Sequence, residues 1–219
     1  MSKNFKGYMG DQIGKLGPAV GRRWKGMMIY ASYQGNVSNP KTDAQQLIRE
    51  RFATLSRLST PFMPAIGISM KPAANRAKST VIGEFIKLNQ GAVTGSLGSV
   101  NVIPTAIKLS EGSLASVSFG APDFSTPLQI SVPITSNNAN AYGASSDDKI
   151  FIVAYCTDAG SVVVSEGMAR GTEESPATGV SIAVPTTFQG MNAHIFAFVA
   201  NANNTKVSTS EYLGNGEIA

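Results

Sequence analysis

The side chains that most often carry out chemistry are few in this sequence and widely separated. Its only histidine, His194, lies in the apolar run 193–200, and its only cysteine, Cys156, ends the apolar run 150–156. One histidine cannot build a histidine-rich metal site, and one cysteine excludes an intramolecular disulfide and a cysteine-based zinc cluster. We interpret both residues as parts of a packed core, with catalysis or metal ligation as the alternative for His194 and a reactive thiol as that for Cys156.

Two pairs of adjacent carboxylates, Asp147-Asp148 and Glu173-Glu174, lie in polar segments with the composition of turns. Such pairs are typical of solvated loops, and the alternative is a loose calcium site completed by nearby asparagines of the segment 137–140. Phosphate-binding signatures are missing, because Gly14-Lys15 lacks the upstream glycine spacing and the preceding strand that such a loop needs. We therefore expect a protein that is not an enzyme and that has no cofactor and no metal.

Charge is distributed unevenly along the chain. Residues 1–90 hold 14 Lys or Arg against 4 Asp or Glu, a net charge of +10, whereas residues 91–219 hold 4 against 10, a net charge of −6. The basic side chains at the start stand among closely spaced glycines, which predicts an extended arm over residues 1–40 that lies against another surface. They are Lys3, Lys6, Lys15, Arg22, Arg23 and Lys25.

Two functions are compatible with this arm. The apolar residues at its end predict a strand or hook over residues 24–33 that docks on a neighbouring protein, and we name them the assembly residues: Trp24, Met27, Met28, Ile29 and Tyr30. The alternative is that the basic side chains neutralise phosphates while aromatic side chains stack on bases, as in non-specific contact with nucleic acid. The salt dependence of binding distinguishes the two functions, because phosphate contacts weaken steeply as salt is added.

A helical connector is predicted over residues 41–90. Thr42 with Gln45 forms a capping box, and the apolar residues that follow have the 3.6-residue period of a helix over residues 42–58 with a buried stripe. The stripe consists of Ala44, Leu47, Ile48, Phe52, Leu55 and Leu58. After two prolines, a second helix is predicted over residues 75–88.

The remainder, residues 91–219, has the alternation of a β domain. Segments such as 128–134 and 180–184 alternate between apolar and small or polar residues, and about eight short strands are separated by turns. This pattern is typical of an antiparallel sandwich, and we predict an immunoglobulin-like one, with a barrel or a small jelly roll as alternatives. The predicted fold is therefore mainly β, preceded by the arm and two helices.

The amino-acid composition bears on the oligomeric state and the cellular location of the protein. With 42% hydrophobic and only 15% charged residues, the sequence predicts large buried or interfacial area and hence homo-oligomers. The first residues have no apolar stretch like that of a secretory signal, and no run is apolar enough to cross a membrane. We expect a protein that stays in the cytoplasm unless it leaves as part of a particle.

Two segments at opposite ends of the chain resemble a known family. They are GKLGPAVGRRWKG at residues 14–26 and KVSTSEYLGNGEI at residues 206–218. Together with Ser38-Asn39-Pro40 ahead of the first helix, they are similar to uncharacterised proteins of Bacteroidetes and their phages, grouped only as a domain of unknown function. The resemblance implies no activity and no site residues. An arm before helices and a β body also resembles, at the level of architecture alone, structural subunits of tailed phages.

These observations favour a non-enzymatic structural or assembly subunit that forms homo-oligomers and contacts other structural proteins through the arm. We expect a phage virion component associated with a portal, capsid or tail. The alternative is a cytoplasmic protein that binds nucleic acid through the basic arm. A third interpretation, a carbohydrate-binding sandwich, needs exposed aromatic loop residues, for which Tyr142, Phe124 and Phe188 are the candidates.

Overall fold

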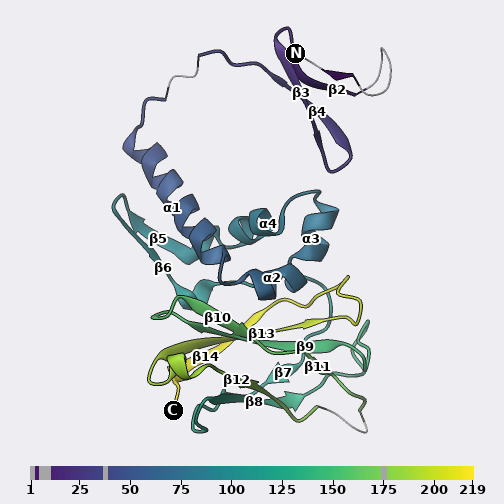
Figure 1. The fold of residues 1–219 in the computed structure, drawn as a ribbon. Coiled ribbons are helices and arrows are strands. Elements are labelled where there is room, and N and C mark those ends of the chain that lie inside the picture. The colour runs from purple at the N-terminus through teal and green to yellow at the C-terminus, as the bar shows by residue number, and fades with distance from the viewer. Residues whose placement is uncertain (1–2, 5–10, 37–38, 174–176) are drawn as a thin grey trace. The chain divides into compact units, whose positions relative to one another are not determined.

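The computed structural model describes residues 3–4, 11–36, 39–173 and 177–219 and divides the chain into two units, Met1–Thr42 and Asp43–Ala219. In Figure 1 the first unit is the strand-rich segment that precedes α1, and the second contains the helices and most of the strands. We describe each unit by itself.

The first unit is an antiparallel sheet with the strand order β1-β2-β3-β4. Its strands are β1 (Lys3–Asn4), β2 (Gln12–Leu16), β3 (Ala19–Trp24) and β4 (Met27–Ser32). Two-residue turns join β2 to β3 and β3 to β4, and each turn contains a glycine with positive φ, Gly17 at 57° and Gly26 at 79°. The glycines therefore build hairpins, and the described part of the predicted arm is pleated rather than loosely extended.

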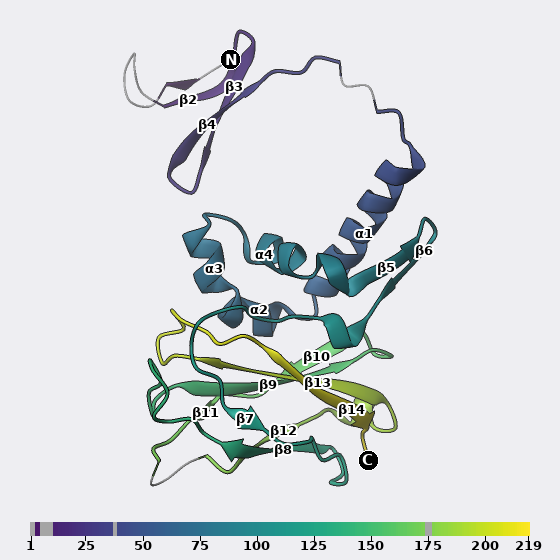
Figure 2. The ribbon, with the colours of Figure 1, turned by 180° about the vertical axis from the view of Figure 1, so that it is seen from behind.

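The second unit has three layers, which Figures 1 and 2 show from opposite sides. A central sheet has the order β10-β9-β13-β14, with β11 also paired to β9, and a smaller sheet has the order β12-β8-β7. The strands of the two sheets are β7 (Ser118–Phe119), β8 (Gln129–Ser136), β9 (Lys149–Cys156), β10 (Ser161–Val164), β11 (Met168–Ala169), β12 (Gly179–Ala183), β13 (Asn192–Ala200) and β14 (Glu211–Glu217). The smaller sheet covers one face of the central sheet, and helices cover the other.

The central strands β9 and β13 are buried on both faces. Along β9, Ile150, Ile152, Ala154 and Cys156 belong to the core shared with the smaller sheet, whereas Phe151, Val153 and Tyr155 belong to the core shared with the helices. Because successive side chains of a strand point to opposite faces, a strand between two layers must be apolar at every position. This explains the uninterrupted apolar runs of the sequence.

The helical layer contains four helices and is followed by a two-stranded hairpin. The helices are α1 (Asp43–Ser59), α2 (Met63–Ser69), α3 (Lys71–Arg76) and α4 (Val81–Leu88), and the hairpin consists of β5 (Val93–Ser96) and β6 (Ser99–Val102). The helix predicted over residues 75–88 is divided, because the Thr80 hydroxyl accepts from the Gly83 amide and caps the start of α4. Phe62 joins the layers, since its fully buried ring lies 4.9 Å from that of Tyr155.

The prediction of a mainly β protein that also contains helices is confirmed. The immunoglobulin-like topology is not confirmed, because the larger sheet is covered by helices on the face away from the smaller sheet. The helices also follow the strands β1 to β4, whereas the sequence analysis placed them after an arm without a sheet. Within the described residues, no helix is long and apolar enough to cross a membrane.

Candidate assembly interface

The assembly residues lie in the first hairpin pair, and the sheet divides them between its two faces. Trp24 ends β3 and is paired with Met27, the first residue of β4, while Arg22 is paired with Ile29. Directly opposed residues of an antiparallel pair share a face, so Trp24, Met27 and Ile29 lie on one face. The two remaining assembly residues, Met28 and Tyr30, lie on the other face.

The basic residues of this unit are also divided between the faces. Arg23 is paired with Met28 in the register and forms an ion pair with Asp11, with 3.3 Å between Nη2 and Oδ2. On the opposite face from Arg23, the Lys15 ammonium lies 3.7 Å from the centre of the Tyr33 ring, which is a cation–π contact. Arg22 and Lys25 are exposed, the side chain of Lys3 is not described, and Lys6 lies outside the described residues. The described basic side chains therefore form no single continuous basic face.

The described part of the first unit has little core of its own. Among its described side chains no apolar one is buried, and the only buried residue is Gly21, at which an added Cβ would meet the Gln12 carbonyl oxygen at 2.0 Å. Trp24 is 44% exposed and Tyr30 is 54% exposed. A single-layer sheet leaves both of its faces accessible, and apolar side chains on such faces are stabilised only when another surface covers them.

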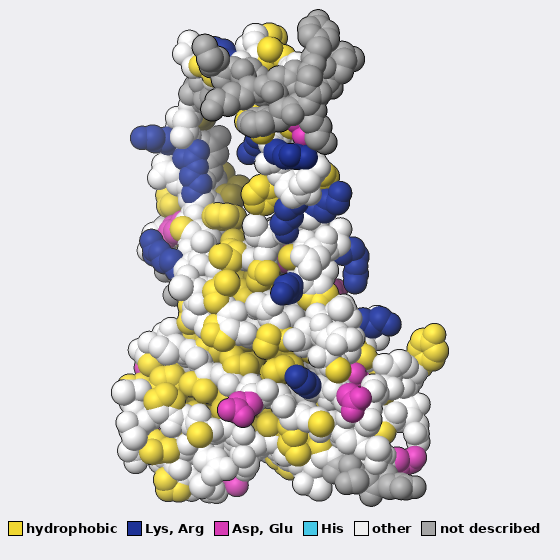
Figure 3. All heavy atoms as spheres, turned by 45° about the vertical axis from the view of Figure 1, so that its right-hand side comes forward, with side chains coloured by type: hydrophobic (Ala, Val, Ile, Leu, Met, Phe, Trp, Pro, Cys, Tyr) yellow, Lys and Arg dark blue, Asp and Glu magenta, His cyan; other side chains and the backbone are white. Residues whose placement is uncertain are grey.

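A second apolar surface lies on the helical layer of the other unit. The predicted stripe of α1 is buried at Leu55 and Leu58, but Ile48 is 68% exposed and Phe52 is 58% exposed, so the prediction of a wholly buried stripe is wrong. The middle of α1 lies beside the β5–β6 hairpin, where Arg51 Nη2 donates to the Gly95 carbonyl at 2.9 Å. Figure 3 shows hydrophobic side chains reaching the surface over this layer, with Lys and Arg beside them.

His194 and Cys156 lie in the two central strands, β13 and β9. His194 Nδ1 lies 3.0 Å from the Tyr212 hydroxyl, and partial burial lowers the pKa of His194 because the charged imidazolium loses solvation. The Tyr212 hydroxyl donates to Nδ1 when that nitrogen is unprotonated. Cys156 is fully buried, with its Sγ 3.6 Å from the Met191 Sδ. No group of three His, Cys, Asp or Glu suited to a metal ion occurs within the described residues.

A buried ion pair joins the loops at one end of the sandwich. Arg170 Nη2 lies 3.5 Å from Asp148 Oδ2, and the side chains are 0% and 2% exposed. Asp148 Oδ2 also accepts from the Ser145 amide at 2.9 Å, while the guanidinium donates to the carbonyls of Ala115 and Asn138. Burial lowers the pKa of Arg170, and the charge of Asp148 opposes that shift. Asp148 therefore fastens the loops together and is not the solvated carboxylate that the sequence suggested.

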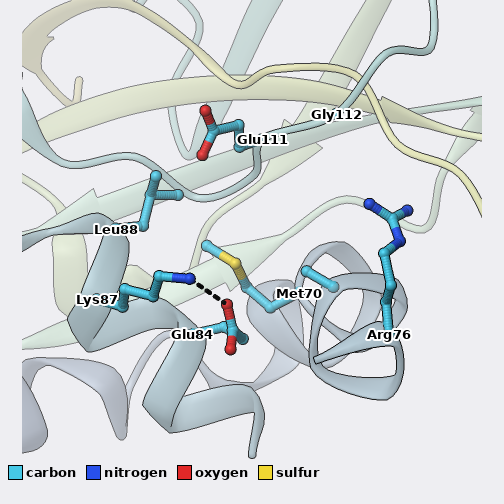
Figure 4. Close-up of a pocket in the computed structure, with 8 residues that line it drawn as sticks. Met70, Arg76, Glu84, Lys87, Leu88, Glu111 and Gly112 are labelled. Carbon is cyan, nitrogen blue, oxygen red and sulfur yellow. Dashed lines mark ion pairs between the residues drawn. The ribbon is translucent and has the colours of Figure 1, made fainter. Parts of the chain in front are cut away.

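The loops do not gather the three aromatic residues that a carbohydrate site would need. Tyr142 is fully exposed, whereas Phe188 is buried in the sandwich core and Phe124 is partly buried against it. The hollows of the surface are also modest. One of about 430 Å³ lies between α3, α4 and the segment 111–112, and Figure 4 shows Glu84 pointing toward Lys87 there while Arg76 and Glu111 lie apart. Glu84 and Glu111 balance the charges of Arg76 and Lys87 around this hollow, so it favours neither anions nor cations.

The fold and surfaces together define a mainly antiparallel β protein with a helical layer and a separate amino-terminal sheet that exposes aromatic side chains. The chain belongs to a family of unknown function, DUF6266, which matches residues 10–214. The resemblance to an uncharacterised family is thereby confirmed. No curated protein matches the chain, and no solved structure matches it.

Proposed function

We propose that this protein is a non-enzymatic structural subunit that assembles with copies of itself through its amino-terminal sheet. The observation that carries the proposal is the absence of any buried apolar side chain among the described residues of that sheet, which nevertheless holds Trp24, Met27, Met28, Ile29 and Tyr30. Buried aromatic anchors commonly dominate protein interfaces. Docking on a neighbouring subunit would cover these side chains.

The alternative partner of the sheet is nucleic acid. Residues 1–42 hold 7 Lys or Arg against 1 Asp, a net charge of +6, which favours phosphates. The positions of the basic side chains favour a protein partner, because Arg23 already pairs with Asp11 and Lys15 already lies over Tyr33. Two of the basic side chains are thus engaged within the sheet.

A virion is the particle that we propose for the assembled subunit. This finer assignment is supported by the resemblance of residues 14–26 and 206–218 to proteins of Bacteroidetes and their phages, and by the combination of a docking segment with a β body. It is tested by recovery of the protein in purified particles. A protein found only in the cytoplasm of cells that release such particles would contradict it.

Light scattering across a series of protein and salt concentrations tests the assembly itself. Trp24→Ala should lower the mass of the assembly, because it removes a large apolar side chain from the faces of the sheet that docking is proposed to cover. The double change Arg22→Ala with Arg23→Ala is the control and should weaken assembly only modestly. A wild-type protein that is monomeric at every concentration would refute the proposal, and assembly lost only in the arginine variant would favour nucleic acid.

A further inference from the structure

The outer edge of β4 is an unpaired strand edge with an unusual composition. β3 pairs with one side of β4 over all six residues, from Trp24 opposite Met27 to Ala19 opposite Ser32. Within the described part of the chain, no strand pairs with the other side. The sequence of β4, MMIYAS, contains no charge, no proline and no glycine. Edges of this kind are templates for a further strand.

Another long edge among the described strands, that of β14, is protected in ways that β4 is not. β14 carries Glu211 and Glu217 at its ends, and its pairing with β13 shifts register between Ile195 and Phe196. Charges and bulges are devices that discourage pairing with another chain. β1, at the opposite edge of the first sheet, has only two residues. Among the described edge strands, β4 is the longest one that has no charge, proline or glycine, because β12 (GVSIA) has five residues and begins with a glycine, and β6 and β10 have four residues each.

The turn before β4 determines which backbone groups point outward. Lys25 and Gly26 have φ of 44° and 79°, as in a type I′ turn, so Trp24 and Met27 form a hydrogen-bonded pair. Hydrogen-bonded pairs then recur at every second residue, and the bond from the Tyr33 amide to the Pro18 carbonyl, 2.6 Å, has the same phase. The amide and carbonyl groups of the intervening residues, Met28, Tyr30 and Ser32, face away from β3.

We propose that β4 of a second copy pairs antiparallel with this edge, with Tyr30 opposite Tyr30 of the second copy. The inference rests on the proposed function, since it specifies one contact of that assembly, the strand edge, and leaves the faces of the sheet for contacts with further copies. Two copies joined edge to edge must be related by a two-fold axis perpendicular to the sheet, which pairs residues of the same face. Centring the axis on Tyr30 places Met28 opposite Ser32 and lets all six outward backbone groups form hydrogen bonds.

Charge does not prevent pairing with a second copy in this register, although the first units of the two copies carry charge of the same sign. Lys25 falls opposite Gly35 of the second copy, so no like charges are directly opposed. The β3 strands of the two copies, which carry Arg22 and Arg23, are three strand spacings apart, about 14 Å. This distance exceeds the Debye length of about 8 Å at physiological salt, so the repulsion is screened. Dimerisation is therefore expected to tighten as salt is added.

The first test removes one outward amide from the full-length chain. Ser32→Pro deletes a donor that faces away from β3, whereas Ser32→Ala removes the same hydroxyl and keeps the donor. Analytical ultracentrifugation should show dimerisation at least tenfold weaker for Ser32→Pro, equivalent to about 1.4 kcal/mol, and nearly unchanged for Ser32→Ala. Equal affinities for the two variants would refute pairing at this edge.

The second test measures the register and does not depend on how well proline is tolerated. Opposed residues of a hydrogen-bonded pair have Cα atoms about 5.5 Å apart, within the range of a disulfide, so Tyr30→Cys should form a disulfide-linked dimer on mild oxidation. In Met28→Cys and Ser32→Cys, the controls, the equivalent residues of the two copies are four positions apart, about 14 Å. The native Cys156 is buried.

The outcomes separate this inference from the proposed function. Cross-linking at residue 30 but not at 28 or 32, with weakened dimers of Ser32→Pro, supports the pairing. Cross-linking that is strongest at 28 or 32 refutes the register. A protein that assembles without cross-linking at 30 and without a response to Ser32→Pro refutes strand addition and leaves the proposed function standing. A wild-type chain that stays monomeric refutes both.

Discussion

Replacing Phe62 by alanine tests whether the helices are an integral layer of the second unit. The Phe62 ring is fully buried and lies 4.9 Å from the ring of Tyr155, 6.0 Å from that of Phe85 and 6.3 Å from that of Phe196. It therefore contacts both the helices and the central sheet. Truncating such a side chain removes transfer free energy and leaves a cavity, at a cost of about 3–5 kcal/mol.

Urea and thermal unfolding at one fixed protein concentration measure this cost. For a unit of this size, about 2–4 °C of melting temperature is lost per kcal/mol, so Phe62→Ala should melt roughly 6–20 °C below the wild type. Phe52→Ala is the matched control, because it makes the same change in the same layer at a ring that is 58% exposed. It should cost about 1 kcal/mol or less.

Either of two results would refute this reasoning. Losses of similar size for the two variants would mean that the exposed and buried faces of the helical layer have been assigned wrongly. A loss below about 1 kcal/mol for Phe62→Ala, with unfolding still cooperative, would mean that the helices are only loosely attached to the central sheet.

Three further predictions concern the second unit. A fragment of residues 91–219 should show no cooperative unfolding, because removal of the helices exposes the helix-facing core of the central sheet. A fragment of residues 43–219 should unfold cooperatively, and circular dichroism during heating distinguishes the two results. Asp148→Asn should lower the free energy of unfolding by about 3–5 kcal/mol in urea titrations, because it leaves a buried guanidinium uncompensated, while Asp147→Asn, at an exposed neighbour, should change it little. Because the pKa of His194 is lowered in the folded protein, its contribution to stability is present above pH 6.5 and is lost as the pH falls below this value. The wild-type melting temperature should therefore fall between pH 7 and pH 5, and His194→Gln should reduce this fall. An equal fall in the variant and the wild type would contradict the prediction.

The sequence was sufficient to predict the central strands of the two packed sheets but not the helical layer that covers the larger sheet. The apolar runs 150–156 and 193–200 predicted strands, and β9 and β13 lie there. Every position of these runs is apolar or small apart from His194, which is itself a sign of burial on both faces. Taken with the amphipathic helix over residues 42–58, this sign indicated that helices cover the sheet, whereas the prediction treated them as a connector.

Periodicity identified the apolar side of α1 without showing what covers it. Leu55 and Leu58 are covered by the chain itself, whereas Ile48 and Phe52 continue the same stripe into solvent. The apolar residues have the same spacing in both halves of α1, because this spacing reflects the period of the helix and not what covers it.

The buried Arg170 was missed for a different reason. Its partner Asp148 is 22 positions away, and no local signal marks a pair brought together by separate loops.

The glycines of the first unit were interpreted as part of an extended arm, although their positions indicated turns. Gly17 and Gly26 each occupy a two-residue turn, and Gly14 and Gly21 are opposed where β2 and β3 pair. Regular spacing of glycine between short apolar and basic segments is compatible with hairpins as well as with a loose arm. The basic character of the segment favoured the arm. Turn geometry, which depends on positive φ at single residues, forms hairpins here instead of an extended arm.

The division of the chain into two units gives the assembly proposal a strong internal control. The stability of residues 43–219 resides in cores that contain no side chain of the first unit, so Phe62→Ala should change unfolding without changing the mass of the assembly until the unit begins to melt. Conversely, Trp24→Ala and Ser32→Pro alter a sheet outside those cores and should change mass without changing the unfolding of the second unit. Independence of this kind is expected for distant sites with no shared contacts. If a change in the first unit lowers the unfolding midpoint of the second by several degrees, then assembly itself stabilises the second unit, and the two units are not independent.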